Sequence, residues 1–286
     1  MRHGFAVRVG PYGFRVGSDW RAPVAELERL YAGHPRPQGG VADFTVRLEA
    51  TRPWRRVVRP SVAIGGDWFL PEAAPLPLRH GLLAAEMGMN LQLALGGRRH
   101  LLLHASSVER DGRALLMTGE SGAGKSTLSV LLAAAGWRFM GDEFALLDLD
   151  TGEVRAFPRP ISLKNESVAA AEAAWPGAAF GPWLRGTPKG DIRHMVPPAD
   201  ALARMDEPAR PALLLFPRFG FADDVREVPR SEAFMRLTQA STNYTALGRR
   251  GFESLVRLVK GVPALAIDYP DGASGVAAVE RLWTHP

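Results

Sequence analysis

The chain has 286 residues, enough for one large domain or two ordinary ones, and 46% of them are hydrophobic. Cysteine is absent, which excludes disulfides, thiolate metal sites and a cysteine nucleophile. The formal net charge is +5, but the basic residues are scattered without interleaved aromatic residues, so we expect no nucleic-acid binding. No apolar run is long enough to span a bilayer and no signal region is visible, so we expect a cytoplasmic protein without membrane contact.

The sequence of the first 97 residues predicts a β-rich module closed by a helix. Residues 5–16 alternate around Pro11-Tyr12-Gly13, a pattern typical of a β-hairpin. The other elements expected here are a helix at 23–31, a loop at 34–40, strands at 43–50 and 61–70, and a long apolar helix at 78–95 that Gly96-Gly97 ends. No catalytic constellation is visible, so we expect a structural or partner-binding role for residues 1–97.

A second region, residues 98–286, opens with two strands at 99–109 and 113–118. Arg110-Asp111-Gly112 joins them, and an Asp-Gly pair between strands is a strong hairpin signal. The second strand would then pair antiparallel with the first, unlike the parallel sheet of doubly wound nucleotide-binding folds. We therefore expect an α/β fold with an α+β mixed sheet.

The rest of the chain alternates irregularly between helical and strand patterns, which suits the same class. The expected elements are a helix at 126–135, a hairpin of strands 144–149 and 154–157, an Ala-rich helix from Ser167, a loop at 176–198, a strand at 213–216, helices at 231–240 and 251–260, a strand at 264–269 and a final helix at 275–283.

A phosphate-binding pattern, G-x-x-x-x-G-K-[ST], matches Gly119-Glu120-Ser121-Gly122-Ala123-Gly124-Lys125-Ser126. The glycines let successive backbone amides turn toward one anion, and the N-terminus of the following helix adds its dipole. Lys125 supplies a mobile positive charge for the phosphates, and Ser126 supplies a hydroxyl ligand for Mg²⁺. The strand before the loop and the helix after it are the expected context. The sequence therefore predicts binding of a nucleoside triphosphate with Mg²⁺.

Asp142-Glu143 follows the strand after that helix, so we expect its carboxylates beside the phosphates. One of them can hold Mg²⁺ with Ser126, and the other can accept the proton of an attacking hydroxyl. His104 shares a strand face with Leu102 and Ser106. It is either a hydrogen-bonded core histidine or a residue that orients the acid.

Lysine is rare in this chain, with only four lysines among the 35 basic residues. A lysine that persists where arginine fills most surface roles marks a place where a compact ammonium is needed. Lys164 and Lys189 therefore become candidates, together with Arg193, for contacts to phosphate or to an acidic substrate. Lys189 lies in a Gly/Pro-bracketed loop that we expect to close over the site.

Three segments together resemble the HPr kinase/phosphorylase family: His104-Ala105-Ser106-Ser107-Val108, the loop at 119–126, and Gly141-Asp142-Glu143. The order and spacing match a family in which a histidine precedes the loop and an acidic pair follows it. The likeness covers about residues 98–286. Segments 158–165, 186–190 and 241–244 are more similar to the divergent branch called HPr kinase-related kinases, group A.

The resemblance implies a P-loop kinase core similar to HPr kinase and phosphoenolpyruvate carboxykinase, using ATP or another nucleoside triphosphate with Mg²⁺. It implies that Asp142 is the general base, that His104 supports that acid or the transferring phosphoryl group, and that Lys125 and the loop amides stabilise the transferring group. Ser126 and Glu143 would bind the metal. Thr127, which completes the nucleotide-binding segment, stands where the bifunctional enzymes carry Glu, and Glu143 replaces their second Asp, so phosphorylase activity is not implied.

We therefore expect a phosphotransferase that acts on a hydroxyl, with Ser or Thr of a peptide or small protein as the leading acceptor. Relatives in this branch occur beside small PqqD-like peptide-binding proteins, which makes such a protein an expected partner. Two alternatives stay open: a kinase for a sugar or other metabolite, and a nucleotide-sensing partner module without catalysis. The sequence leaves open whether the chain forms a homo-oligomer.

Overall fold

The computed structural model describes residues 2–69 and 74–284, and the chain divides into two compact units. The first unit comprises residues 1–97 and 179–196, and the second comprises residues 98–178 and 197–286. The sequence predicted a boundary between residues 97 and 98, with residues 179–196 in the second region. In the structure, residues 179–196 belong to the first unit instead. Within the described ranges, no helix combines the length and the apolar character needed to cross a bilayer.

The first unit is a five-stranded sheet with helices α1 and α2. Its strands follow the order β1 (His3–Val9), β2 (Tyr12–Ser18), β3 (Phe44–Ala50), β4 (Ser61–Gly66) and β5 (Leu76–Pro77). Helix α1 spans Arg21–Leu30 and α2 spans Gly81–Gly96, and short 3-10 turns cover Gln38–Gly40, Pro53–Arg56 and Leu78–His80. The predicted hairpin at 5–16 is confirmed as β1–β2. The strand expected at 61–70 ends at Gly66, and its last predicted residue, Leu70, lies outside the described residues.

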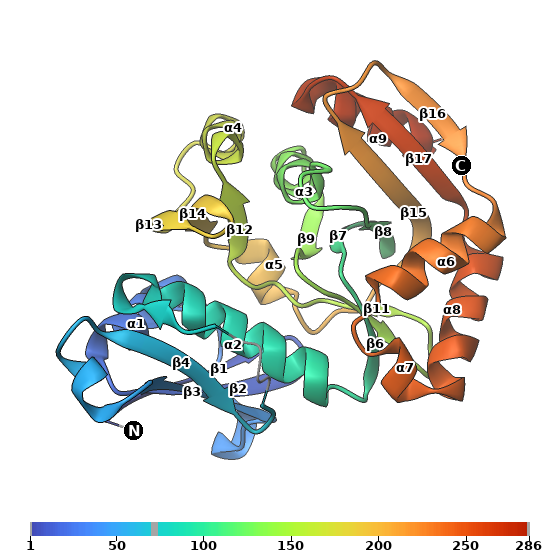
Figure 1. Cartoon of the computed structure of the whole chain (residues 1–286). Helices are drawn as coiled ribbons and strands as arrows, with labels where there is room; N and C mark the ends of the chain where they lie inside the picture. Colours follow the sequence, from blue (N-terminus) through green and yellow to red (C-terminus); the bar gives the residue numbers. More distant parts are fainter. Residues whose placement is uncertain (1, 70–73, 285–286) are drawn as a thin grey trace. The chain divides into compact units, whose positions relative to one another are not determined.

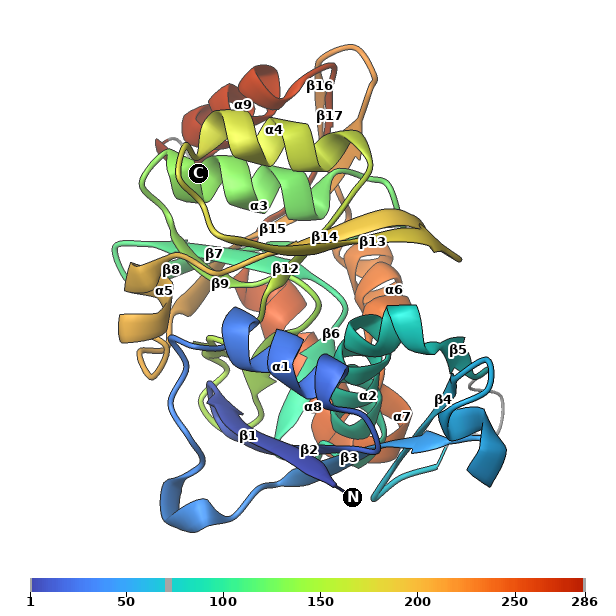
Figure 2. The same cartoon turned by 90° about the vertical axis from the view of Figure 1, so that its left-hand side faces the viewer.

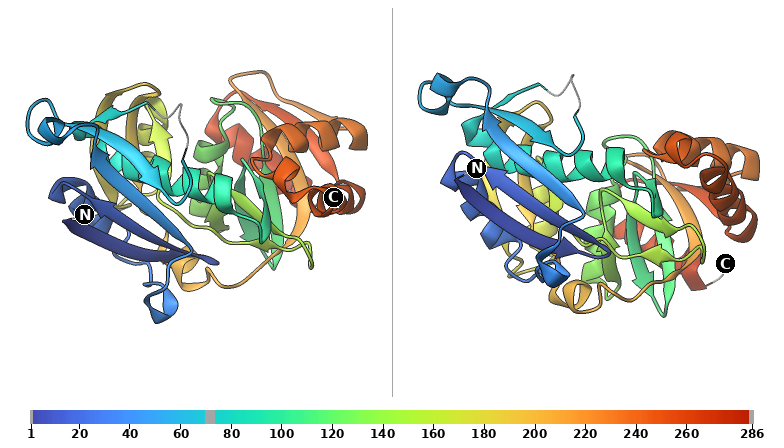
Figure 3. Two further views of the ribbon diagram at one scale, coloured as in Figure 1. Left: turned by 60° about the horizontal axis from the view of Figure 1, so that its bottom comes forward. Right: turned by 90° about the horizontal axis from the view of Figure 1, so that it is seen from below.

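Helix α2 lies across strands β3 and β4 (Figure 3). Gly88 allows the close approach, because a Cβ there would lie 2.5 Å from Cγ1 of Val46. The core of this unit is made of alternating strand residues under the helices, among them Phe14, Val46 and Leu48.

The prediction of a loop at 176–198 is wrong, because the segment forms a hairpin of β13 (Phe180–Thr187) and β14 (Gly190–Met195). Leu184 and Ile192 are buried on it. Several prolines and glycines hide the strand pattern in the sequence, yet Gly186 and Gly190 take positive φ values at the irregular turn that they flank. Lys189 lies at this turn.

The second unit is built on a six-stranded mixed sheet (Figure 1). Its strands follow the order β16 (Asp224–Glu227), β17 (Ala264–Tyr269), β15 (Arg210–Phe219), β8 (Arg113–Met117), β7 (Ser106–Arg110) and β9 (Arg138–Gly141). Strand β8 runs parallel to β15 and antiparallel to β7, which confirms the predicted mixed sheet. Asp111 and Gly112 both have positive φ, as a two-residue hairpin turn of this kind requires.

The prediction of one continuous strand at 99–109 is wrong, because the chain changes sheets at His104-Ala105. Residues before this point form β6 (His100–Leu103), which belongs to a separate three-stranded sheet with β10 (Ala145–Asp148) and β11 (Val154–Arg155). The His104 amide donates to the carbonyl of Ala240 at 2.8 Å instead of to a strand. The hairpin expected at 144–157 is confirmed as β10–β11, although β11 has only two residues.

Helices cover both faces of the six-stranded sheet. On one face, Leu115 and Leu215 pack with Leu128 of α3 and Trp283 of α9. On the other, Leu116 and Phe216 pack with residues of α6 and α8. Helices α3 and α4 run side by side (Figure 2). The bounds in this unit are α3 Lys125–Ala134, α4 Glu166–Ala174, α5 Ala199–Ala203, α6 Arg230–Ala240, α7 Tyr244–Leu247, α8 Arg249–Gly261 and α9 Gly272–Thr284, with strand β12 at Ile161–Lys164.

Candidate functional site

The glycine-rich loop at residues 119–124 joins the carboxyl end of β8 to the first residue of α3. Gly122 and Gly124 have φ values of 89° and 90°, a region that L side chains rarely adopt. Gly124 is also held by its surroundings, because a Cβ there would lie 2.3 Å from Oη of Tyr269. The loop therefore follows a tight path over Tyr269, and that path requires glycine at position 124.

Lys125 folds back over the loop. Its side chain is buried, and Nζ donates hydrogen bonds to the carbonyl oxygens of Gly119 at 2.7 Å and Glu120 at 2.9 Å. Burial lowers the pKa of Lys125, whereas the charges of Asp142 and Glu143 oppose this shift. The ammonium thus sits in a polar pocket that the loop itself forms.

Asp142 follows the last residue of β9 and is 7% exposed. Strand β9 pairs with β7, and this pairing brings Ser106 to Asp142, where the serine hydroxyl donates to Oδ1. The Ser126 hydroxyl, on the first turn of α3, lies near the carboxylate and lowers its pKa. Burial and the charge of Glu143 raise the pKa of Asp142 to about 6, although both hydroxyls and Lys125 act in the opposite direction. A carboxylate with a pKa this close to neutrality can take up and release a proton.

His104 and Glu143 lie at the open side of this cluster. Nδ1 of His104 is 3.9 Å from Oε2 of Glu143, and the two side chains are 50% and 34% exposed. The hydroxyl of Thr118 donates to the His104 carbonyl at 3.0 Å and fixes the backbone there. Of the two alternatives for His104, the core histidine is wrong, because the change of sheets at this residue turns its side chain out of the sheet interior.

The three candidate substrate residues divide between the two units. Lys164 ends β12 in the second unit, and its charge lowers the pKa of Lys125, so it belongs to the same electrostatic cluster. Lys189 and Arg193 lie on the hairpin of the first unit. There the Arg193 guanidinium donates to the Gly181 carbonyl at 3.1 Å and lies over the ring of Phe180.

Two contributors to this site escaped the sequence interpretation. Ser106 was given no role of its own there, yet it donates a hydrogen bond directly to Asp142. Tyr269 ends β17, and β17 runs parallel to β15 as β15 does to β8, so its ring reaches the loop from the same edge of the sheet. Only its position at the end of a buried apolar strand gave a sequence signal.

Within residues 2–69 and 74–284, no three or more His, Asp or Glu side chains gather as a ligand set for a metal ion. Ser126, Asp142 and Glu143 instead provide one hydroxyl and two carboxylates close to the loop. Oxygen ligands of this kind suit Mg²⁺, which binds through few protein groups and completes its shell with phosphates and water.

Comparison with known proteins gives only a weak structural likeness. Neither a protein-family model nor a curated protein matches the chain. Among solved structures, the HPr(Ser) kinase/phosphatase from Coxiella burnetii is similar over 65% of this chain and 99% of that one, with a TM-score of 0.28 and 15% sequence identity. A likeness at this TM-score does not by itself establish a fold, a family or an activity.

Proposed function

We propose that this chain is an ATP- and Mg²⁺-dependent kinase of the HPr kinase-related type, which phosphorylates a Ser or Thr hydroxyl of a peptide or small protein. The observation that carries the proposal is the position of Asp142. This buried carboxylate, with a pKa raised to about 6, lies near Ser126 and the loop lysine, both of which act on its pKa. A triphosphate-binding loop with an adjacent proton acceptor is what transfer to a hydroxyl requires.

The loop residues fit a triphosphate. Gly122 and Gly124 open the backbone so that the amides at the start of α3 can face an anion. The ammonium of Lys125 has its hydrogen-bond partners within the loop, so its reorientation toward a phosphate exchanges carbonyl acceptors for charged ones. Thr127 continues the same first turn of the helix.

The oxygen ligands beside the loop fit Mg²⁺, which would neutralise charge on the phosphates when bound. Ser126 would hold it together with one of the two adjacent carboxylates. In the first division of labour, Glu143 binds the metal, and Asp142 takes the proton of the acceptor hydroxyl with support from His104. The closeness of the Ser126 hydroxyl to Asp142 favours a second division, in which Asp142 shares the metal with Ser126 and Glu143 takes the proton beside His104.

Labelled γ-phosphate transfer tests the function. The chain is incubated with Mg²⁺ and labelled ATP, together with peptides and small proteins encoded by neighbouring genes, including any PqqD-like protein. A parallel series offers sugars and other metabolites. We expect label on a Ser or Thr of a peptide or protein. Label on a metabolite would instead assign the chain as a small-molecule kinase, and no transfer to any acceptor would favour the non-catalytic nucleotide module.

Two variants separate the roles of the acids. In the first division, Asp142→Asn should retain nucleotide binding and lose transfer by at least about a hundredfold, the usual contribution of general-base catalysis. In the first division, Glu143→Gln raises the Mg²⁺ concentration needed for half-maximal rate. In the second division, it is Asp142→Asn that raises the Mg²⁺ concentration needed for half-maximal rate. Glu227→Gln, which alters an exposed carboxylate on β16, is the matched control. Full transfer by both the Asp142 and the Glu143 variants would overturn the site.

A further inference from the structure

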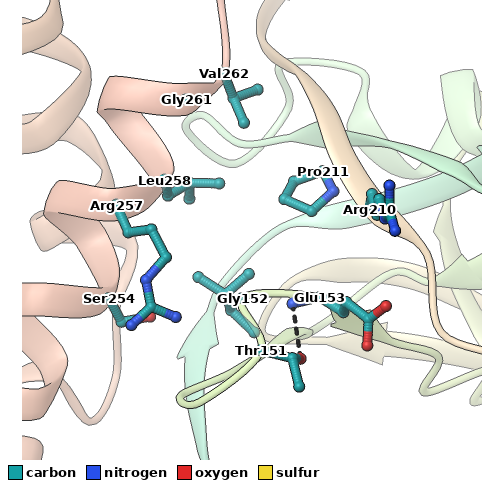
Figure 4. Close-up of a pocket in the computed structure, with 11 residues that line it drawn as sticks. Thr151, Gly152, Glu153, Arg210, Pro211, Ser254, Arg257, Leu258, Gly261 and Val262 are labelled. Carbon is teal, nitrogen blue, oxygen red and sulfur yellow. Dashed lines mark hydrogen bonds between the residues drawn. The ribbon is translucent and has the colours of Figure 1, made fainter.

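A pocket of about 420 Å³ lies in the second unit (Figure 4). It is at the edge of the sheet away from the glycine-rich loop. Arg210, the first residue of β15, pairs with Arg113, the first residue of β8, whereas the loop follows the last residue of β8. The pocket walls are the turn at 151–153, the start of β15 and the second half of α8. Its volume is in the usual range for sites that bind small molecules.

Ser254 gives the first indication of a ligand. It lines the pocket from α8 and is only 2% exposed, and its hydroxyl oxygen has no hydrogen-bond partner among the described residues. A buried hydroxyl without a partner is unfavourable, so native proteins usually satisfy such groups. A polar ligand atom in the pocket would supply the missing partner.

Two guanidinium groups on the walls give the second indication. Arg257 donates from one nitrogen to the carbonyl of Asp150 at 2.9 Å. In the part of the chain that the structure describes, no carboxylate lies within ion-pair distance of Arg257 or Arg210. Arginine carries five N–H donors in a planar fork that matches a carboxylate. Both side chains therefore have donors available for an anion.

The remaining walls limit the kind of anion. Pro211, Leu258 and Val262 present apolar surface to the pocket. Glu153 also lines it, so the two arginines and one carboxylate leave a single net positive charge. Inorganic phosphate would leave the apolar walls uncovered, whereas a monoanion with a short hydrocarbon part would use both features.

We propose that this pocket binds a small carboxylate with an apolar body. The carboxylate lies between Arg257 and Ser254, and the hydrocarbon part packs on Leu258 and Val262. The site is separate from the loop and does not depend on the kinase proposal, because no residue of the loop contributes to it.

Calorimetric titration of the intact chain tests the site with hexanoate and benzoate. Hexanol serves as the uncharged control, and inorganic phosphate as the anion without an apolar body. We expect saturable binding of the two carboxylates with one site per chain and a rise in Tm, and no binding of hexanol. Absence of saturable carboxylate binding at millimolar concentrations overturns the proposal. Phosphate binding as tight as that of the carboxylates overturns the assignment of the ligand class.

Ser254→Ala is the most informative variant. It removes the unpartnered hydroxyl, so the protein should fold with unchanged or higher Tm, while carboxylate affinity falls about tenfold, as expected for a hydrogen bond to a charged group. Arg257→Ala should abolish binding. Arg249→Ala, on the same helix but 89% exposed and paired with Glu253, should leave affinity unchanged, as should Lys125→Ala in the loop. Wild-type affinity in both the Ser254 and Arg257 variants places the ligand elsewhere and overturns the proposal.

Discussion

The hydroxyl of Ser106 donates a hydrogen bond to the carboxylate of Asp142, although the two residues are 36 positions apart in the chain. The antiparallel pairing of β7 with β9 brings them together. This bond favours the ionised carboxylate, and burial favours the protonated one, so the pKa of Asp142 reflects a balance between a fixed donor and a dry environment.

Removal of that donor should shift the balance. Ser106→Ala should raise the pKa of Asp142 above its value of about 6, because burial and the charge of Glu143 then act with less opposition. Carbon-13 NMR titration of the metal-free protein measures this directly. Ser107→Ala is the matched control, since that neighbouring hydroxyl is buried and has no hydrogen-bond partner in the described ranges. An unchanged pKa in Ser106→Ala would contradict the role given to this bond.

The same raised pKa has a consequence for stability. The folded-state pKa of Asp142 lies above its ordinary value of 3.8, so the folded state binds the proton more tightly. The associated stability is present below about pH 4 and is lost as the pH rises through about 6. Relative to the wild type, the free energy of unfolding of Asp142→Asn should therefore be higher at pH 7 than at pH 4, by up to about 3 kcal/mol. Urea unfolding of both proteins at the two pH values tests it, and a pH-independent difference would refute it.

Lys125→Ala should weaken ATP binding by about a hundredfold, because the charge-assisted hydrogen bonds to the phosphates are lost. Lys125→Arg should also bind poorly, since the planar guanidinium does not fit the narrow space in which Nζ reaches two loop carbonyls. Calorimetric titration with ATP gives the affinities. Lys260→Ala, an exposed lysine on α8, is the control, and wild-type affinity in the Lys125 variants would rule out the loop as the nucleotide site.

Alanine substitutions at the two left-handed glycines should differ in severity. Gly122→Ala meets no atom within 4 Å, so only backbone strain of about 1 kcal/mol is expected. Gly124→Ala adds the clash with Oη of Tyr269 and should lower both stability and ATP affinity further. Tyr269→Phe removes that oxygen, so the double variant should recover part of the loss. Equal effects of the two single variants in urea unfolding would argue against a tight path over Tyr269.

The buried ion pair between Glu109 and Arg138 should contribute strongly to folding, since both side chains are 2% exposed. Burial raises the pKa of Glu109, but the Gly112 amide and the Arg138 guanidinium outweigh this, and the net shift is downward. Glu109→Ala should lower the free energy of unfolding by about 3–5 kcal/mol, because it leaves a buried charge unpaired. Chemical denaturation checks this. Glu253→Ala in the exposed pair with Arg249 should change it by less than about 1 kcal/mol.

The sequence predicted those parts of the fold that short-range chemistry decides. The Asp111-Gly112 turn requires two positive φ values, and an Asp-Gly pair is typical of such a turn. The break at His104-Ala105 has no such signal, because the carbonyl of Ala240 accepts the His104 amide from a distant part of the chain. A continuous apolar pattern therefore concealed a change of sheets.

In the candidate site, too, short-range sequence patterns predicted some features and long-range strand pairing decided the others. The order of strand, loop, helix and strand indicated that Asp142 lies near the loop, and the influence of Lys125 and Ser126 on its pKa agrees with that order. Ser106 and Tyr269 reach the site only through strand pairing in the folded sheet. No local pattern identifies which buried serine or tyrosine will end at the loop.

The hairpin β13–β14 makes the first unit discontinuous in the chain. It packs within that unit through Gly181, whose Cβ position lies 3.0 Å from Leu30, and through Nε2 of His80, which donates to the Arg185 carbonyl at 2.9 Å. During synthesis the unit therefore cannot be completed until residue 196 has left the ribosome, after the glycine-rich loop and helix α3 have emerged. A fragment cut after residue 97 would lack the hairpin, and the complementary fragment would carry it without its contacts to Leu30 and His80.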